Sequence, residues 1–196
     1  MAAPSDSPPP DIDYAPAFLD QAAATSLFET LLAQTDWKEE TGVRFGKPWV
    51  GKRKVCHYGD PGVVYTYAGM ARATELWPHV LKDLKPRVEA ATGQVFNYAL
   101  LNLYRNGKDR LGYHSDATHG LTSTTIASVS LGAARDFQIK PKMGLARTTT
   151  LKLAHGSLLV MKGRTQETHQ HALPPRVGIK EPRINITWRA IAMPGN

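Results

Sequence analysis

Hydrophobic residues follow a helical period in the first half of the chain and a strand period in the second. From Asp20 to Thr35, apolar residues recur at the three-to-four spacing of an amphipathic helix, and Asp20 is suited to cap its start. A second such segment runs from Trp77 to Thr92 and ends at Gly93. Because proline disfavours helical geometry at the residue before it, Pro86 predicts a kink there or two short helices.

After Gly93, apolar and polar residues alternate in short segments rich in Val, Ile, Thr and aromatic residues, separated by Gly, Pro and Asn. This pattern predicts seven strands, at residues 95–105, 124–131, 134–140, 147–153, 157–162, 168–173 and 183–191. Helices followed by many short strands are typical of an α+β fold, here an antiparallel sandwich or jelly roll backed by helices.

The remaining segments define the domain organisation. Residues 1–12 are rich in proline and serine, which predicts a disordered tail. A total of 196 residues is enough for one sizeable core, so we expect residues 13–196 to form a single domain. Residues 37–67 are dense in Gly, Pro, basic and aromatic residues, and we expect them to form hairpins over the mouth of the barrel.

Composition excludes several classes of protein. No apolar run approaches the roughly 18 residues that a membrane span needs. The single cysteine, Cys56, excludes an internal disulfide framework and a zinc site built on several thiolates, which fits a reducing, intracellular compartment. Lys and Arg total 24 against 17 Asp and Glu, a net charge of +7 that favours a polyanionic partner such as nucleic acid.

One face of the last predicted strand, RINITWR, is polar. Alternation places Arg183, Asn185, Thr187 and Arg189 on one side of it. Two arginines facing into a barrel would be costly without an anion, and the planar guanidinium suits a carboxylate or phosphate. The alternative is that this face is the solvated side of an edge strand.

Histidine and aspartate in YHSD also share a face, so His114 and Asp116 could converge on one metal ion. A further histidine would complete the two-histidine, one-carboxylate set that leaves open positions on non-haem Fe(II). His169 and His171, on one face of a later predicted strand, are the candidates.

Asn102 and Tyr104 in NLY share a face just before this segment, and by themselves they are typical of a buried amide and phenol. The ordered series NLY, HSD, a later histidine and RINITWR resembles the AlkB family of Fe(II)- and 2-oxoglutarate-dependent nucleic-acid dealkylases, most of all the branch of the second human AlkB homologue. The segments FGK, YGD, YTY, IASVSLGAARDF and LAHGSLLVM extend this resemblance over roughly residues 37–191. It implies a double-stranded β-helix with a nucleotide-recognition lid of hairpins at about residues 37–70.

The resemblance implies a role for each polar residue of the site. His114, Asp116 and His171 would hold the iron, with His171 chosen because the family's last ligand directly precedes the pattern x-L-P. The residues implied to bind 2-oxoglutarate are Asn102, Tyr104, Arg183, Asn185 and Arg189. Arg183 would pair with its distal carboxylate, and Arg189 would lie near the other carboxylate.

The resemblance also implies a base pocket and a DNA-binding hairpin. Tyr67 would stack on a flipped base opposite His114, with Tyr65 beside it; the alternative is that both tyrosines pack on the core. Phe45, between Arg44 and Gly46, matches a finger that fills the gap left by the flipped base. The cations expected to meet phosphates, unless the hairpin is simply solvated, are Lys47, Lys52, Arg53 and Lys54.

Three residues depart from the double-strand-preferring relative: Arg44 replaces an apolar finger residue, and Ala117 and Thr118 replace acidic residues after HSD. These departures bear on lesion range and strand preference rather than on iron chemistry.

The implied activity is oxidative dealkylation of 1-methyladenine and 3-methylcytosine in double- or single-stranded DNA, and by extension in RNA. It uses Fe(II), 2-oxoglutarate and O2 and releases formaldehyde. The alternatives are a related oxygenase acting on RNA or protein, and a catalytically dead nucleic-acid-binding jelly roll. We expect a monomer that binds no membrane, in the cytoplasm of a bacterium or the nucleus of a eukaryote.

Overall fold

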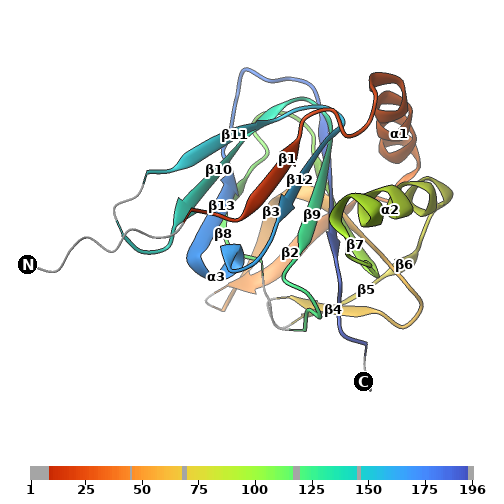
Figure 1. Ribbon diagram of the computed structural model, residues 1–196, viewed down its shortest axis with the longest axis horizontal. Coiled ribbons are helices and arrows are strands. Elements are labelled where there is room, and N and C mark those ends of the chain that lie inside the picture. The colour runs from red at the N-terminus through yellow and green to blue at the C-terminus, as the bar shows by residue number, and fades with distance from the viewer. Residues whose placement is uncertain (1–8, 45, 68–69, 117–119, 145–146, 194–196) are drawn as a thin grey trace, which may run out of the picture.

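The computed structural model describes residues 9–44, 46–67, 70–116, 120–144 and 147–193. Two antiparallel sheets face each other, and two helices cover the outer side of the larger sheet (Figure 1). This is the predicted jelly roll backed by helices, so the predicted fold class is confirmed. Within the described residues, no helix is long and apolar enough to cross a membrane.

The larger sheet has the strand order β1-β12-β9-β14-β7-β3-β2, with β6 paired in parallel to β3. Its strands are β1 (Ile12–Ala15), β2 (Lys38–Arg44), β3 (Lys47–Gly59), β6 (Glu75–Leu76), β7 (Tyr98–Tyr104), β9 (Ile126–Gly132), β12 (Ser157–Met161) and β14 (Arg183–Arg189). The smaller sheet has the order β11-β10-β13-β8, with strands β8 (Leu111–His114), β10 (Arg135–Pro141), β11 (Thr149–Leu153) and β13 (His169–Leu173). All seven predicted strands are present within a few residues of their expected bounds.

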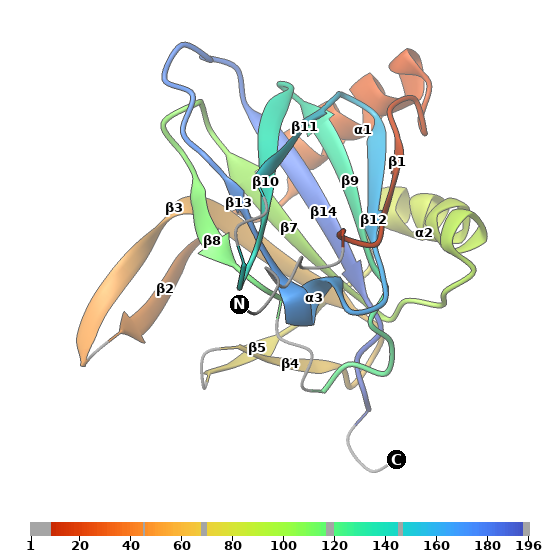
Figure 2. The same ribbon diagram turned by 60° about the vertical axis from the view of Figure 1, so that its left-hand side comes forward.

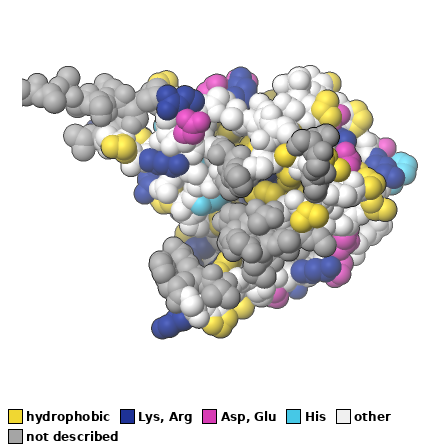
Figure 3. Space-filling model, turned by 90° about the horizontal axis from the view of Figure 1, so that it is seen from below, with side chains coloured by type: hydrophobic (Ala, Val, Ile, Leu, Met, Phe, Trp, Pro, Cys, Tyr) yellow, Lys and Arg dark blue, Asp and Glu magenta, His cyan; other side chains and the backbone are white. Residues whose placement is uncertain are grey.

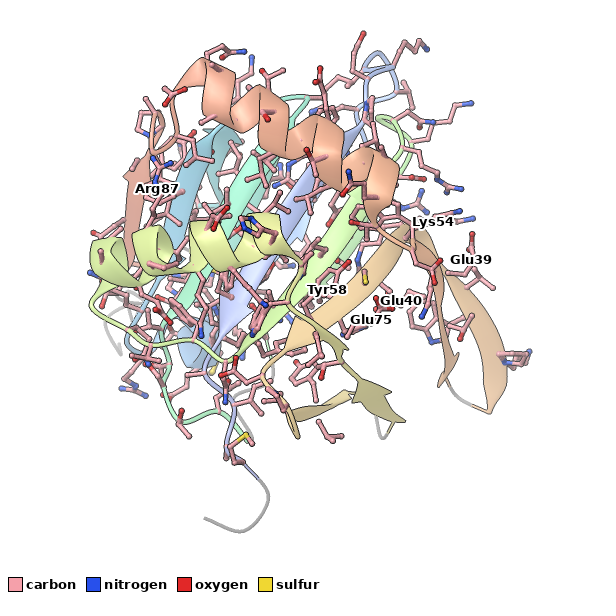
Figure 4. All side chains as sticks on the ribbon, turned by 90° about the vertical axis from the view of Figure 1, so that its right-hand side faces the viewer. Glu39, Glu40, Lys54, Tyr58, Glu75 and Arg87 are labelled. Carbon is pink, nitrogen blue, oxygen red and sulfur yellow. The ribbon has the colours of Figure 1, made fainter. Side chains whose placement is uncertain are left out.

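The helices lie against the outer face of the larger sheet, α1 (Gln21–Gln34) beside α2 (His79–Thr92) (Figure 4). Asp20 caps α1 as predicted, because its carboxylate accepts a hydrogen bond from the Ala23 N–H at 2.8 Å. The expected alternative of two short helices at Pro86 is wrong, since α2 is continuous through that residue. Its buried apolar face outweighs the one backbone hydrogen bond that proline removes.

Strand β14 divides its residues between two environments. Ile184, Ile186 and Trp188 are fully buried in the core between the larger sheet and the helices. The alternate residues, beginning with Arg183, face the smaller sheet. Because β14 pairs with β7 on one side and β9 on the other, the alternative of a solvated edge strand is wrong.

Two hairpins project beyond the sandwich at one end, β2–β3 and the separate pair β4 (Val64–Tyr67) and β5 (Met70–Ala73) (Figure 2). They occupy the region predicted as a lid of hairpins. Strand β3 is long enough to belong to both the hairpin and the larger sheet. Residues 47–50 and, beyond a register irregularity, residues 54–55 pair with β2, and residues 54–59 pair with β7.

The short elements that were not predicted include β1, β6, β8 and the one-turn helix α3 (Thr165–Thr168). Strand β1 begins inside the expected tail, of which residues 1–8 lie outside the described residues. Asp11 already holds this end of the chain, since its N–H donates to Thr165 Oγ1 at 2.9 Å and its carbonyl accepts from Lys162 at 2.9 Å. Elements of two to four residues are too short for a hydrophobic period to show.

Candidate active site

A cavity lies between the two sheets, and polar residues from both line its wall. The larger sheet contributes the inner faces of β7, β9 and β14, and the smaller sheet contributes β8, β10 and β13. The polar lining residues of these six strands and the turn after β8 are Asn102, Tyr104, His114, Asp116, Ser128, His171, Arg183, Asn185, Thr187 and Arg189. Every residue that the sequence predicted to bind metal or 2-oxoglutarate is therefore part of one wall.

Three of these residues form a group with the composition of a metal site. One ligand atom each from His114, Asp116 and His171 lies within 4.8 Å of the others. His114 and His171 are brought together because they are register partners on β8 and β13. His169, the other sequence candidate, is buried on β13 with its Nδ1 at 2.8 Å from Thr168 Oγ1 and is not part of the group.

Main-chain contacts orient the first two members of the group. The His114 ring lies with Nδ1 at 2.9 Å from the Gly112 carbonyl, so an N–H at Nδ1 can donate there and leave Nε2 for a metal. The Asp116 N–H donates to Gln166 Oε1 at 2.9 Å, and the Ser115 hydroxyl donates to the His169 carbonyl at 2.7 Å. The turn after β8 is thus held against α3 and the start of β13.

The electrostatics of the group suit a divalent cation. Burial lowers the pKa of His171 to about 4, so its ring is neutral at pH 7, as a metal ligand must be. Burial alone would raise the pKa of the Asp116 carboxyl, but the neighbouring Arg189, His171 and His114 lower it well below its ordinary value. The carboxylate is therefore ionised, with Arg189 Nη2 at 2.6 Å from its Oδ1.

Two buried arginines leave donors unused inside the cavity wall. Arg183 is 2% exposed and donates through Nη2 to Ser130 Oγ at 2.9 Å, while its Nε has no partner within the described residues. Nε and Nη1 of Arg189 are likewise without a partner there. Burial lowers the pKa of Arg183 to about 10, a cost that an anion would offset. The residues present therefore fit a dicarboxylate beside a metal ion.

A network of three aromatic rings lies beside Arg189. The Arg189 guanidinium lies 5.5 Å from the Tyr65 ring centre, and the Tyr65 ring lies 4.8 Å from that of Tyr98. The Tyr98 hydroxyl is 2.6 Å from His57 Nδ1, and His57 lines the cavity. Tyr65 therefore lines the cavity and also packs in a small core cluster with Tyr98, so its role beside a base stays a prediction. The side chain of Tyr67 lies outside what the structure describes, and its base-stacking role stays a prediction as well.

The hairpin residues separate into exposed and buried cations. Lys47 and Lys52 are exposed and Lys54 is half-buried, whereas Arg53 is 7% exposed and paired with Glu40 and Asn102. We therefore do not retain Arg53 as a phosphate contact. Gly46 has a φ of 71°, which the tight turn requires.

Four other residues with sequence-based expectations cannot be placed. Phe45, Ala117 and Thr118 lie outside the described residues, and the side chain of Arg44 is not described.

Sequence reasoning missed several wall residues: Glu40, Arg53, His57, Ser128, Phe137 and, behind the wall, Gln166. Alternation along KRKVCHY would have placed Arg53 and His57 on one face of β3, opposite Lys52 and Lys54.

Comparisons with known proteins agree with this site. Residues 11–189 match the 2OG-Fe(II) oxygenase superfamily. The chain is 37% identical over 182 residues to DNA oxidative demethylase ALKBH2 of Bos taurus, covering 87% of this chain and 66% of that protein. It is 36% identical over 184 residues to ALKBH2 of Homo sapiens, covering 88% and 70% of the two proteins.

Two further relatives extend the comparison. The human alpha-ketoglutarate-dependent dioxygenase alkB homolog 3 is 36% identical over 186 residues, which cover 90% of this chain and 64% of that protein. The solved structure of OsALKBH1 superposes with a TM-score of 0.63 at 15% identity and covers 93% of this chain, a likeness that concerns the fold alone. The chain spans about two thirds of the length of the curated relatives it matches.

Proposed function

The chain belongs to the 2OG-Fe(II) oxygenase superfamily and within it to the AlkB family, and on this premise we propose that it removes alkyl groups oxidatively from bases in DNA. One observation carries the proposal. A histidine–aspartate–histidine group and two buried arginines with unused donors face one cavity between the two sheets. A protein that only bound nucleic acid would need neither feature.

His114, Asp116 and His171 would hold Fe(II), and Arg183 and Arg189 would bind the two carboxylates of 2-oxoglutarate. When bound, Fe(II) and 2-oxoglutarate together with O2 would supply the oxidising power that hydroxylates an N-alkyl carbon. If the alkyl group is methyl, this carbon leaves as formaldehyde. The chain's own residues bind and orient. The carboxylate of Asp116 is kept ionised, the ring of His171 is kept neutral, and the ring of His114 is turned so that its Nε2 is left for the metal.

The pocket for the base is proposed to lie at the part of the cavity that Tyr65 lines. This ring lies between Arg189 and Tyr98, so a planar base next to it would have its alkyl group close to the metal ligands. Tyr67 is proposed to stack on the base, and Phe45 to fill the gap left in the duplex. An alkylated Watson–Crick edge pairs poorly, so removing such a base from the stack costs less.

DNA is the proposed partner because the most similar relatives include proteins named DNA oxidative demethylase and because the hairpin carries exposed lysines. Lys and Arg side chains lie around the margin of the face seen from below, on the side to which the hairpins project (Figure 3). Activity on RNA, a monomeric state, and location in the cytoplasm or nucleus according to the organism belong to the same proposal.

The test measures succinate and formaldehyde with Fe(II), 2-oxoglutarate and O2. The substrates are oligonucleotides carrying 1-methyladenine or 3-methylcytosine as single-stranded DNA, duplex DNA and RNA, together with a methylated peptide, and the control is the unmethylated strand. We expect equal amounts of both products with methylated DNA. Faster turnover of RNA or peptide would favour the related oxygenase, and binding without either product would favour the catalytically dead module.

A further inference from the structure

An ion pair is buried where the β2–β3 hairpin leaves the larger sheet. Arg53 on β3 donates through Nη2 to Oε1 of Glu40 on β2 at 3.0 Å, and its Nη1 lies 2.9 Å from Oε2 of the same carboxylate as an ion pair. The two side chains are 8% and 9% exposed. Figure 4 shows Glu40 at this base, inward from Glu39. A buried pair of this kind contributes little net stability, because desolvation offsets most of the attraction.

The same guanidinium has a third partner, which belongs to the cavity. Arg53 Nε donates to Asn102 Oδ1 at 2.6 Å. Arginine has donors and no acceptor, so the amide oxygen of Asn102 must point toward Arg53 and the amide nitrogen must point away. The hydrogen bond from Arg53 therefore determines which way the Asn102 amide faces.

The amide nitrogen of Asn102 in turn faces the polar wall. Nδ2 donates to Asn185 Oδ1 at 3.3 Å, and Thr187 Oγ1 donates to the same oxygen at 2.8 Å. Asn185 Nδ2 completes the chain by donating to Ser128 Oγ at 2.6 Å. An amide nitrogen has two hydrogens, so Asn102 keeps one donor for a ligand. If the amide of Asn102 were rotated by 180°, its oxygen instead of its N–H groups would face the anion that Arg183 and Arg189 are proposed to bind.

We propose that Arg53 is a positioning residue for the co-substrate: from the base of the hairpin it holds the Asn102 amide with its N–H donors toward the bound dicarboxylate. The inference rests on the proposed function, because 2-oxoglutarate is the ligand concerned. Arg53 would thereby connect the β2–β3 hairpin, which is proposed to contact DNA, with the affinity of the cavity for 2-oxoglutarate. It also explains why a cation in a basic hairpin is withdrawn from solvent.

A double-mutant cycle on the full chain tests this inference. Isothermal titration calorimetry measures the Kd of 2-oxoglutarate with Mn(II) in place of Fe(II), for the unchanged chain, Arg53→Met, Asn102→Ala and the double variant. We expect each single change to raise the Kd by about tenfold, the order that a lost supporting hydrogen bond costs such sites. If Arg53 acts through Asn102, the double variant binds no more weakly than Asn102→Ala.

The matched control is Arg176→Met, which removes an arginine paired with Asp136 at 2.6 Å outside the cavity. It should leave the Kd unchanged. Arg53→Lys should restore only part of the affinity, because one ammonium cannot replace a guanidinium that bridges Glu40 and Asn102. The same cycle is run with Arg53→Lys if Arg53→Met does not fold.

Two outcomes would overturn the inference while leaving the proposed function standing: a Kd unchanged in Arg53→Met, or losses in the double variant equal to the product of the two single losses. Failure of the unchanged chain to bind 2-oxoglutarate would instead overturn the proposed function, and the inference with it.

Discussion

His169 and His171 share one face of β13 but differ in their surroundings. His171 has Asp116 Oδ2 at 3.7 Å from its Nε2, the His114 ring at 4.3 Å between centres, and Phe137 stacked on it at 5.2 Å. His169 instead contacts Thr168. Although only two residues apart on β13, His171 thus belongs to the group with His114 and Asp116, whereas His169 lies outside this group and contacts Thr168.

Replacing the three ligands should therefore have a different effect from replacing His169. We expect His114→Ala, Asp116→Ala and His171→Ala each to abolish turnover and to weaken Mn(II) binding beyond detection by calorimetry, because each removes a ligand atom. His169→Ala should retain metal binding and lose only part of its activity. An inactive His169→Ala beside an active His171→Ala would show that the third ligand is misassigned.

Arg183 should carry much of the affinity for the co-substrate. Arg183→Met removes a charge-assisted contact to a carboxylate, worth about 1.5–3 kcal/mol, and should raise the Kd of 2-oxoglutarate roughly 10- to 100-fold. Arg135→Met is the comparison: that arginine is also buried, but its Nη2 already donates to the Asp109 and Pro174 carbonyls. It should lose stability with little change in Kd, and equal Kd values for the two variants would contradict the assignment of Arg183.

For single residues, the sequence predicted the position of those side chains whose direction follows from alternation along a regular strand. Arg183 and Arg189 were placed correctly because β14 is a regular strand. Arg53 was not, because the cations of the hairpin were treated as one group; alternation along β3 separates Arg53 from Lys52 and Lys54, but it does not reveal the partners of Arg53. Its role depends on Glu40 and Asn102, which are 13 and 49 residues away. No local pattern contains such partners.

Among the elements, α3 has a role out of proportion to its single turn. It presents Gln166, 4% exposed, to the Asp116 N–H, and its main chain is fixed by Lys142, whose Nζ donates to the Gln166 carbonyl at 2.8 Å. Helix α3 could not be predicted from the sequence, since its four residues are too few to show a helical period. The longer elements were predictable because a buried face repeats along them several times.

Gln166→Ala should therefore weaken metal binding without touching a ligand. The Asp116 N–H would lose its acceptor and the turn after β8 would be less well fixed, so we expect the Mn(II) Kd to rise about 10-fold or more. Thr165→Val is the matched control on the same helix, because Thr165 is also buried but bonds to Asp11 instead. Calorimetry on both variants checks this, and equal Kd values would mean that α3 contributes only stability.

Considered as a whole, the molecule is two sheets that meet at the proposed ligand site. Ligands held by residues of both sheets bind the folded state alone and should stabilise it. At 100 times its Kd, each of the two ligands, Mn(II) and 2-oxoglutarate, contributes about 2.7 kcal/mol, so the two together contribute about 5 kcal/mol. For a chain of this size that corresponds to a rise in Tm of roughly 10–20 °C, measured by differential scanning calorimetry. Asp116→Ala should show no such rise, and the same rise in that variant would place the ligands elsewhere.

The distribution of charge over the molecule makes a separate prediction. The net charge is +7, and the exposed hairpin lysines include Lys47 and Lys52. If they contact phosphates, the slope of log K for DNA against log salt should fall by about one for each lysine changed to Gln. Lys82→Gln, on the exposed side of α2, should leave the slope unchanged. Fluorescence anisotropy at several salt concentrations measures it, and identical slopes in all three variants would exclude the hairpin as the DNA contact.

Strand β3 is a single element of 13 residues, on the order of 40 Å long at the usual rise per residue. One end is anchored by six pairs to β7, and the other end is the arm of the hairpin. Between these two parts, residues 51–53 pair with neither β2 nor β7, because the register of β2 against β3 shifts between Glu39 and Thr41. A register irregularity locally disrupts the ladder and bends a strand, so the arm of the hairpin can change its angle there while the pairs to β7 stay intact. Amide exchange should accordingly be fast up to residues 51–53 and slow from Lys54 to Gly59, with a sharp boundary between the two parts.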